Sequence, residues 1–312
     1  GQGGIIKSIA NNMAVLDDIN KYIENKAGIV LIATGASFNA CEASKYAFLK
    51  YRNKPVHVLD TYEAIHVRDT LTAHYAIIVV SQSGESLEIK TISNILKDQQ
   101  TSHACICNDQ HSTLWKNASY KIDMQAGKEV SSATKSHTAT IYLLYLLSVY
   151  KNEELLNSLS NLDQLVDATL HSTSQSIKKF SGFIKNAGHL YILGTSLHRV
   201  NALQASLLIE EKLFINSQAF TISDFFHGHI EAFSKNDKII LIYSEDELNS
   251  LEKYMDRLKE LGANVFIITD DVNAKANQDK CLYFKSNGNK YFSHITSIIP
   301  FQLVCENLAS EI

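Results

Sequence analysis

The sequence has little proline and no strong excess of charge, and each shortage excludes a class of protein. Its 312 residues include only two prolines and 13 glycines, which excludes collagen-like and low-complexity chains. Lys and Arg total 29 against 33 Asp and Glu, so the net charge is −4. A nucleic-acid binder held by bulk charge is normally basic, and we therefore expect no nucleic-acid partner.

Long apolar runs are also absent. The most apolar stretch, IYLLYLLSVY at 141–150, is far shorter than the roughly 20 residues that a membrane span needs. We interpret it as a buried helix and expect no membrane partner. The first residues, GQGGIIKSIANN, lack the apolar segment of a secretion signal.

Cysteine is scarce, and its number is odd. Five cysteines in a chain of this length do not make a disulfide scaffold, and a reducing cytoplasm fits them best. Cys105 and Cys107 lie in an apolar run, ACIC, with no second Cys or His pair at ligand spacing, so we interpret them as buried strand residues. The sequence predicts no metal site and no cofactor.

Apolar strand-like runs alternate with amphipathic helical stretches. In the first half, such runs occur at 28–33, 55–60, 75–80, 103–108 and 120–124. In the second half, they occur at 189–196, 237–244 and 264–270. Runs without polar alternation are typical of strands buried on both faces, and the alternation predicts parallel sheets covered by helices.

The pattern of the first half restarts in the second. HLYILGTS resembles GIVLIATGAS, and each is followed by a helical stretch. This indicates an internal duplication of one α/β unit. A polar helical stretch at 151–187 lies between the copies, and we place the domains at 1–170 and 171–312. The expected class is α/β, with two doubly wound, flavodoxin-like parallel sheets flanked by helices.

A serine-rich loop, SQSGES at 81–86, follows the third strand and opens a helix. The first N–H groups of a helix have no intrahelical partner, and the helix dipole adds positive charge there. Gly84 allows close approach of the backbone, and the serines add hydroxyl donors. The loop therefore predicts a phosphate site. The alternative is a turn in which Ser83 or Ser86 serves only as an N-cap.

A second loop, TGASFN at 34–39, follows the first strand. Open parallel sheets bind ligands at the carboxyl ends of adjacent strands, so this loop strengthens the phosphate prediction. The corresponding place in the second copy holds YSEDEL, whose three acids repel phosphate. We therefore assign the anion site to the first copy alone.

Four segments in a duplicated α/β chain, TGASFN, SQSGES, EVSSATKSHTA and DFFHGHIEAF, resemble the SIS (sugar isomerase) family. The resemblance covers about 28–312 and is strongest to the isomerase part of glucosamine-6-phosphate synthase and to SIS-type amino-sugar-phosphate deaminases. It implies two tandem SIS domains, the first with the phosphate loop and the second with a catalytic Glu and His. We expect no glutamine-dependent amination, because 312 residues leave no room for a glutaminase domain.

The resemblance also implies the residues that hold the substrate. The expected contacts are Ser37, Ser81, Gln82, Ser83, Ser86, Ser131, Ser132 and Thr134. Further candidates are Gly35, Ala36, Glu129 and Lys135. The alternative for Glu129 is a structural carboxylate, and the alternative for Lys135 is a helix cap or an ion pair.

Two residues match the family's acid–base groups. Glu211 falls on the glutamate that moves the carbon-bound proton, and His227, in FFHGH, falls on the histidine that opens the sugar ring. Histidine suits this task because its pKa lies near neutrality. The alternatives are a solvated helix acid and a loop histidine bonded to backbone. His198 and Arg199 are interpreted as surface residues or as borders of the cleft.

The chain departs from the family pattern at three places. Gln204 and Leu208 stand where the family has Glu and Lys on the helix of Glu211, and His229 replaces the proline after HG. The sequence also ends before the tail that closes over the site in relatives. The fructosamine-6-phosphate deglycase branch also lacks that helix lysine.

The function implied is a cytoplasmic phosphosugar isomerase or deaminase that acts on an amino-sugar 6-phosphate. The ligand is a hexosamine or fructosamine 6-phosphate, and the resemblance implies a homodimer with its site at the interface. A fructosamine-6-phosphate deglycase is one alternative. A sugar-phosphate sensor without turnover is an alternative of another class.

Overall fold

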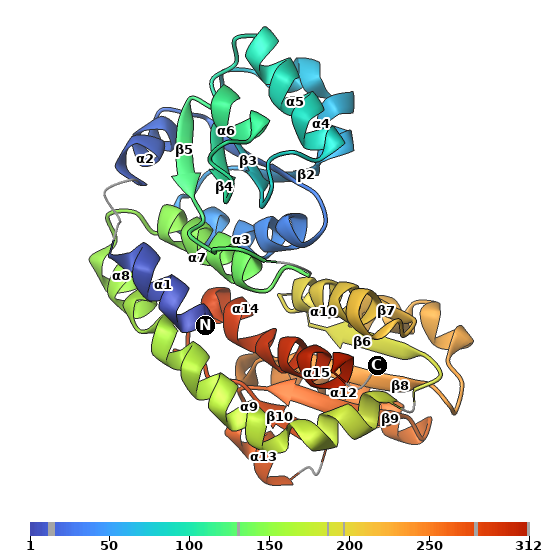
Figure 1. Cartoon of the computed structure of the whole chain (residues 1–312). Coiled ribbons are helices and arrows are strands. Elements are labelled where there is room, and N and C mark those ends of the chain that lie inside the picture. The colour runs from blue at the N-terminus through green and yellow to red at the C-terminus, as the bar shows by residue number, and fades with distance from the viewer. Residues whose placement is uncertain (12–15, 130–131, 186, 196, 278–279, 311–312) are drawn as a thin grey trace. The chain divides into compact units, whose positions relative to one another are not determined.

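The apolar runs of the first copy form a parallel sheet with the order β2-β1-β3-β4-β5 (Figure 1). The computed structural model describes residues 1–11, 16–129, 132–185, 187–195, 197–277 and 280–310. The strands are β1 (Gly28–Ala33), β2 (Val56–Asp60), β3 (Tyr75–Ser81), β4 (Ala104–Cys107) and β5 (Tyr120–Asp123). Every residue of β1 and β4 is buried, as expected for strands covered on two faces.

Helices cover this sheet in two groups. The helices are α1 (Gln2–Ala10), α2 (Leu16–Glu24), α3 (Ala36–Tyr51), α4 (Thr61–His66), α5 (Leu87–Asp98), α6 (Thr113–Asn117) and α7 (Lys135–Ser148). Helix α3 packs on α7, whereas α5 packs on α4 and α6. The run predicted as a buried helix lies largely in α7, whose residues from Ser136 to Ser148 are all buried. None of the helices in the described ranges is long and apolar enough to cross a membrane.

The second copy forms another parallel sheet, ordered β10-β9-β8-β6-β7. Its strands are β6 (Leu190–Gly194), β7 (Ser217–Thr221), β8 (Lys238–Tyr243), β9 (Asn264–Thr269) and β10 (Cys281–Tyr283). Read from β7, this order repeats that of the first sheet, so the predicted duplication and fold class are confirmed. The sequence pattern missed β7 and β10, which are edge strands and are incompletely buried.

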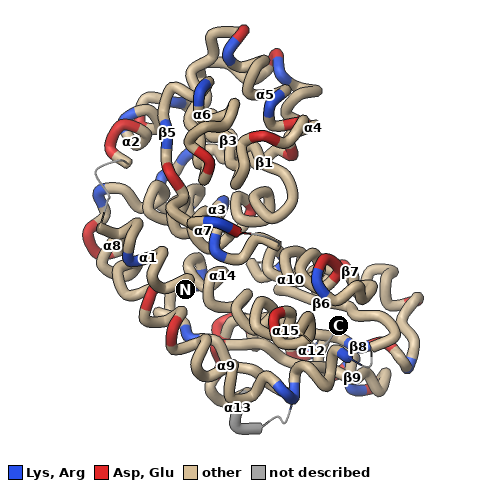
Figure 2. The backbone as a smooth tube through the Cα atoms, viewed as in Figure 1, with Lys and Arg blue, Asp and Glu red and all other residues tan. Residues whose placement is uncertain are grey.

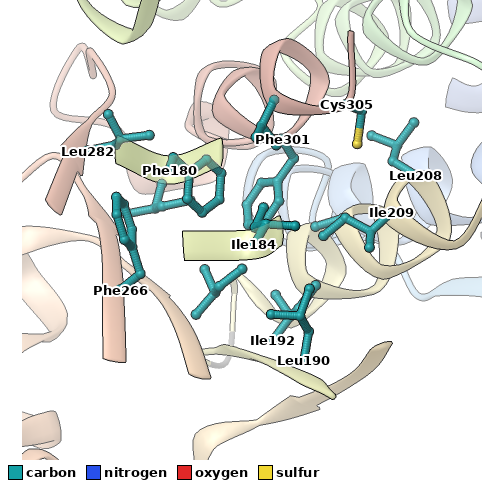
Figure 3. Close-up of a cluster of buried hydrophobic side chains, with 14 of the residues drawn as sticks. Phe180, Ile184, Leu190, Ile192, Leu208, Ile209, Phe266, Leu282, Phe301 and Cys305 are labelled. Atoms are coloured by element: carbon teal, nitrogen blue, oxygen red, sulfur yellow. The ribbon is translucent and has the colours of Figure 1, made fainter. Parts of the chain in front are cut away.

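Helix α8 (Glu153–Ser160) still belongs to the first part of the chain, and the helices of the second copy enclose an aromatic core. They are α9 (Leu162–Lys185), α10 (Arg199–Leu213), α11 (Ile222–Phe226), α12 (Leu248–Glu260), α13 (Val272–Asn277), α14 (His294–Ser297) and α15 (Ile299–Ala309). Phe180 contacts both Phe266 and Phe301, with ring centroids 4.7 and 5.6 Å apart (Figure 3).

The chain divides into two units, Gly1–Asp163 and Gln164–Ile312. The division lies at the start of α9, within the polar stretch that the sequence pattern placed between the copies. In each unit, the chain order of the sheet reverses beside its first strand, at β1 and β3 in the first unit and at β6 and β8 in the second. Ligands of open α/β sheets bind at the carboxyl ends of such strands.

Candidate functional site

A hollow of about 240 Å³ lies at the carboxyl ends of β1 and β3, where the order of the first sheet reverses. Six predicted residues line it: Ala36, Ser37, Ser81, Gln82, Ser83 and Ser86. The sequence missed four other lining residues: Thr34, Val80, Glu88 and Ile89. The two loops that the sequence pattern singled out therefore meet in one place, which we call the serine hollow.

Two helices begin at the serine hollow. The N-cap residues are Gly35 for α3 and Ser86 for α5, and neither makes a side-chain capping hydrogen bond. The N–H groups of both first turns thus have no side-chain cap, and both helix dipoles contribute positive charge. None of the described residues that line the hollow is Lys or Arg, and charges of both signs are scattered along the unit (Figure 2). This arrangement suits a single phosphate held by dipoles and hydroxyls.

The serine loop is held in shape by its own side chains. The N–H of Gly84 donates to Ser81 Oγ at 3.0 Å, and the N–H of Glu85 donates to Ser83 Oγ at 3.3 Å. Each hydroxyl accepts a backbone proton, so its own O–H remains available to donate to an anion. Gly84 itself has a φ of 64° and is buried.

We expect Gly84→Ala to distort this loop. A Cβ at Gly84 would lie 2.4 Å from Ser112 Oγ and 2.8 Å from Cys107 Sγ. Gly262→Ala is the matched control, because Gly262 has a φ of 66° and open space around it. Gly84→Ala should cost about 2 kcal/mol more in unfolding free energy than the control. Urea titrations of both variants check this, and equal losses would mean that the contact with Ser112 does not matter.

The carboxylate of Glu129 forms hydrogen bonds with the start of α7. Its carboxylate accepts the N–H groups of Thr134 at 2.9 Å and Lys135 at 2.6 Å, together with the hydroxyl of Ser136. Burial alone raises the pKa of Glu129, but the hydrogen bonds from Ser136, Thr134 and Lys135 outweigh burial and lower it. This geometry favours the structural reading of Glu129.

The neighbouring candidates have separate surroundings. Ser131 lies outside the described residues. Ser132 Oγ is shielded from solvent and has no hydrogen-bond partner in the described part of the chain, as expected of a hydroxyl that awaits a ligand. Lys135 Nζ donates to the carbonyl of Lys128 at 3.3 Å.

No sequence pattern pointed to His137, which supports the first glycine loop. His137 lies in the first turn of α7, is buried, and its Nδ1 hydrogen-bonds the carbonyl oxygen of Ala36 at 3.0 Å. Glu129 fixes the start of the same helix. The turn that presents Ser37 is therefore tied to α7, and the separation of 101 positions between His137 and Ala36 explains why no local motif shows the link.

Glu211 lies on the exposed side of α10, close to the end of this helix. It has no hydrogen-bond or ion-pair partner in the described ranges, whereas Glu210 accepts the N–H of Ser217 at 3.3 Å. Partial burial raises the pKa of Glu211, and the charge of Lys212 partly opposes this shift. A carboxyl with a raised pKa and no partner is suited to take up and release a proton.

His227 is exposed and directly follows α11. Its backbone N–H caps α11 by donating to the carbonyl of Asp224 at 3.0 Å, and its ring has no partner in the described ranges. His229, at the position of the family's proline, stacks on the ring of Phe220 with centroids 3.8 Å apart.

The two departures on α10 are core residues. Gln204 and Leu208 are both 1% exposed. Leu208 belongs to the cluster that includes Ile209 and Cys305 (Figure 3). A lysine at this place would have to be buried among apolar side chains, so the leucine agrees with the local packing.

His198 corrects a prediction, because it is a core residue and not a surface one. It is fully buried, and its Nε2 lies 2.8 Å from Ser244 Oγ. A hollow at the ends of β8 and β9 is lined by Glu245, Asp246 and Asp270, together with Lys290. No group of three or more His, Cys, Asp or Glu in the described ranges could hold a metal ion.

The geometry of a duplicated sheet with a serine hollow defines a class of protein. The chain matches the SIS domain model over residues 22–150 and 183–309, and it belongs to this family. It is 25% identical to glutamine–fructose-6-phosphate aminotransferase (isomerizing) of Francisella tularensis, over 98% of this chain and 53% of the relative. It is 28% identical to the enzyme of the same name from Clostridium perfringens, over 92% of this chain and 50% of that one. The chain thus spans about half the length of the curated relatives it matches.

Solved structures show the same fold. The C-terminal domain of the Francisella tularensis aminotransferase superposes with a TM-score of 0.86, at 24% identity over 99% of this chain and 93% of the other. Tagatose-6-phosphate ketose/aldose isomerase from Escherichia coli superposes with a TM-score of 0.80, at 14% identity over 99% of this chain and 91% of the other. The chain therefore has the fold of the C-terminal domain of the aminotransferase.

Proposed function

We propose that this protein is a phosphosugar isomerase that deaminates an amino-sugar 6-phosphate. The serine hollow carries the proposal, because it offers hydroxyls and two uncapped helix starts to one phosphate. Membership of the SIS family supports the isomerase chemistry, and the relatives named above act on phosphosugars.

The residues have separate roles in this proposal. Ser37, Ser81, Gln82, Ser83 and Ser86 hold the phosphosugar, and Ser132 and Thr134 border it. His227 opens the ring. Glu211 then takes the proton from C2 of the open-chain sugar and returns it to C1, which leaves an imine at C2. Water adds to this imine and ammonia leaves, so the products are a ketose 6-phosphate and ammonia.

The resemblance further implies a homodimer in which the partner donates the ring-opening histidine. The proposal therefore requires that Glu211 and His227 both act on the bound sugar. Either chain of the dimer can supply the His227. Mixing Glu211→Gln with His227→Asn chains tests this point. Restored turnover in the mixture would support a shared site, and inactivity in a proven heterodimer would contradict it.

A deglycase is the second candidate, and Leu208 favours it. The α10 position at which the synthase carries a lysine is apolar core here. In that reaction, a proton moves from C1 to C2 of a fructosamine 6-phosphate, and water then replaces the amine at C1. The residue roles stay the same.

Ammonia release from glucosamine 6-phosphate, galactosamine 6-phosphate and fructosamine 6-phosphate tests turnover directly. Calorimetry measures the binding of each sugar. An enzyme should bind its sugar and also convert it, whereas a sensor should bind it without turnover. Binding with no ammonia and no isomerised product from any of them would overturn the catalytic proposal and leave the sensor.

We expect Ser83→Ala to weaken phosphosugar binding about tenfold, because it removes one hydroxyl bonded to a charged group. Ser174→Ala, on the exposed side of α9, is the control and should change nothing. Calorimetry with the same phosphosugar measures both variants. An unchanged affinity in Ser83→Ala would show that the serine loop does not bind the phosphate.

A further inference from the structure

The serine hollow contains one acid to which the proposed function gives no role. Glu88 lies in the first turn of α5 and lines the hollow, and no other lining residue that the structure describes carries a charge. Glu88 is half-buried, and its carboxylate makes no hydrogen bond or ion pair within the described ranges. An unpaired acid beside a phosphate site opposes the binding of the phosphate, so its presence calls for a ligand that compensates it.

The surroundings of Glu88 hold it at the hollow without neutralising it. The N–H of Lys90 donates to the carbonyl of Ser86 at 2.9 Å, and Ile89 is 2% exposed in the apolar core, so the first turn of α5 is fixed. The ammonium of Lys90 lies 3.6 Å from the carboxylate of Glu85 and is paired there. The negative charge of Glu88 therefore remains directed at whatever occupies the hollow.

A phosphate bound at the start of α5 meets this carboxylate. The same helix dipole attracts both anions, but the anions repel each other. A sphere of about 240 Å³ is roughly 8 Å across, which equals the Debye length at physiological ionic strength, so salt screens the repulsion only in part. A neutral sugar carrying a phosphate thus binds against a like charge. A phosphosugar that also carries one positive charge removes the conflict.

We propose that Glu88 selects phosphosugars that carry an ammonium in place of the C2 hydroxyl. The carboxylate pairs with the ammonium, while the serines and the two helix starts hold the phosphate. The inference rests on the proposed function and adds the residue that distinguishes a hexosamine 6-phosphate from a hexose 6-phosphate. It also explains how the product leaves: the ketose 6-phosphate has lost the ammonium, so Glu88 repels its phosphate and favours release.

Two ring analogues that cannot open, and so cannot be turned over, test the inference. They are the 1,5-anhydro derivatives of glucosamine 6-phosphate and glucose 6-phosphate, which differ only in the group at C2. Calorimetry at about pH 7 without divalent cations gives a dissociation constant for each. We expect the unmodified protein to bind the amino analogue about fivefold more tightly, and Glu88→Gln to bind the two almost equally. Glu88→Lys should reverse the preference.

Glu63→Gln is the matched control. Glu63 is also an acid in the first turn of a helix, α4, which begins at the end of β2, but it is exposed and does not line the serine hollow. This variant loses the same charge from the same unit. It should keep the fivefold preference of the unmodified protein, about 1 kcal/mol, because an effect of net charge alone does not depend on the C2 group.

The ratio of the two affinities is the decisive quantity. If Glu88 served only to stabilise the start of α5, its replacement would change both affinities by the same factor. Equal affinities in the unmodified protein, or an unchanged ratio in Glu88→Gln, would therefore overturn the inference and leave the proposed function intact. A preference that required added Mg²⁺ would assign Glu88 to a metal carried by the phosphate and would also overturn it. Binding of neither analogue to the unmodified protein would overturn the proposed function and this inference with it.

Discussion

Glu211→Gln should lower turnover by a factor of about 10² to 10⁴, the range that a positioned general base contributes. Its affinity for the phosphosugar should stay within about twofold, because the serine hollow supplies the phosphate contacts. Glutamine keeps the shape of the side chain but cannot take up a proton. The raised pKa of Glu211, caused mainly by partial burial, agrees with such a role.

Glu210→Gln is the matched control for this experiment. Glu210 is the adjacent acid on α10, but its carboxylate accepts the N–H of Ser217. We expect this variant to keep its turnover and to lose a little stability. Initial rates of ammonia release and calorimetric affinities measure both properties for the two variants. Loss of turnover in Glu210→Gln alone would show that the proton-transfer role was assigned to the wrong acid.

The sequence predicted those parts of the molecule that are determined by short, continuous sequence patterns. Both sheets were recognisable because their central strands are buried on two faces and lack polar residues, as β1 shows. The edge strand β7, SQAFT, was not predicted because only one of its residues is buried. The two loops of the serine hollow were found because each is a continuous segment directly after a strand.

Contacts between distant segments could not be predicted in the same way. Nothing around His137 indicates that its ring bonds the carbonyl of Ala36. Glu129 was a candidate for contact with the substrate, but its carboxylate instead accepts the N–H groups of Thr134 and Lys135. His198 follows a glycine loop, which suggested the surface, yet the chain folds over it and buries it.

Acid should destabilise the second unit through two buried histidines. Burial, reinforced by the charge of His294, lowers the pKa of His198 to about 3, and burial lowers the pKa of His294 to about 4. In the unfolded chain, both titrate near 6.5. Between pH 6.5 and 4, the unfolded state therefore binds more protons than the folded state, so the unfolding free energy falls as the pH falls.

The size of this effect follows from proton linkage. Each histidine should cost about 1 kcal/mol between about pH 7 and about pH 5.5, so the pair should cost about 2 to 3 kcal/mol. Burial raises the pKa of Glu247, whose Oε2 lies 4.0 Å from His198 Nε2, and this carboxyl contributes with the opposite sign. Above about pH 5.5, carboxyls with ordinary pKa values remain largely ionised, so the histidines should dominate this window.

Urea titrations followed by circular dichroism at the two pH values measure the effect, and fluorescence of Trp115 follows the first unit separately. In His294→Gln, the loss between the two pH values should fall by about half, whatever the absolute stability of the variant. His171→Gln, at an exposed position on α9, should keep the full loss. An unchanged loss in His294→Gln would mean that His294 is not held neutral in the folded protein. The difference between variants is the decisive quantity, because it cancels the contribution of the carboxyls.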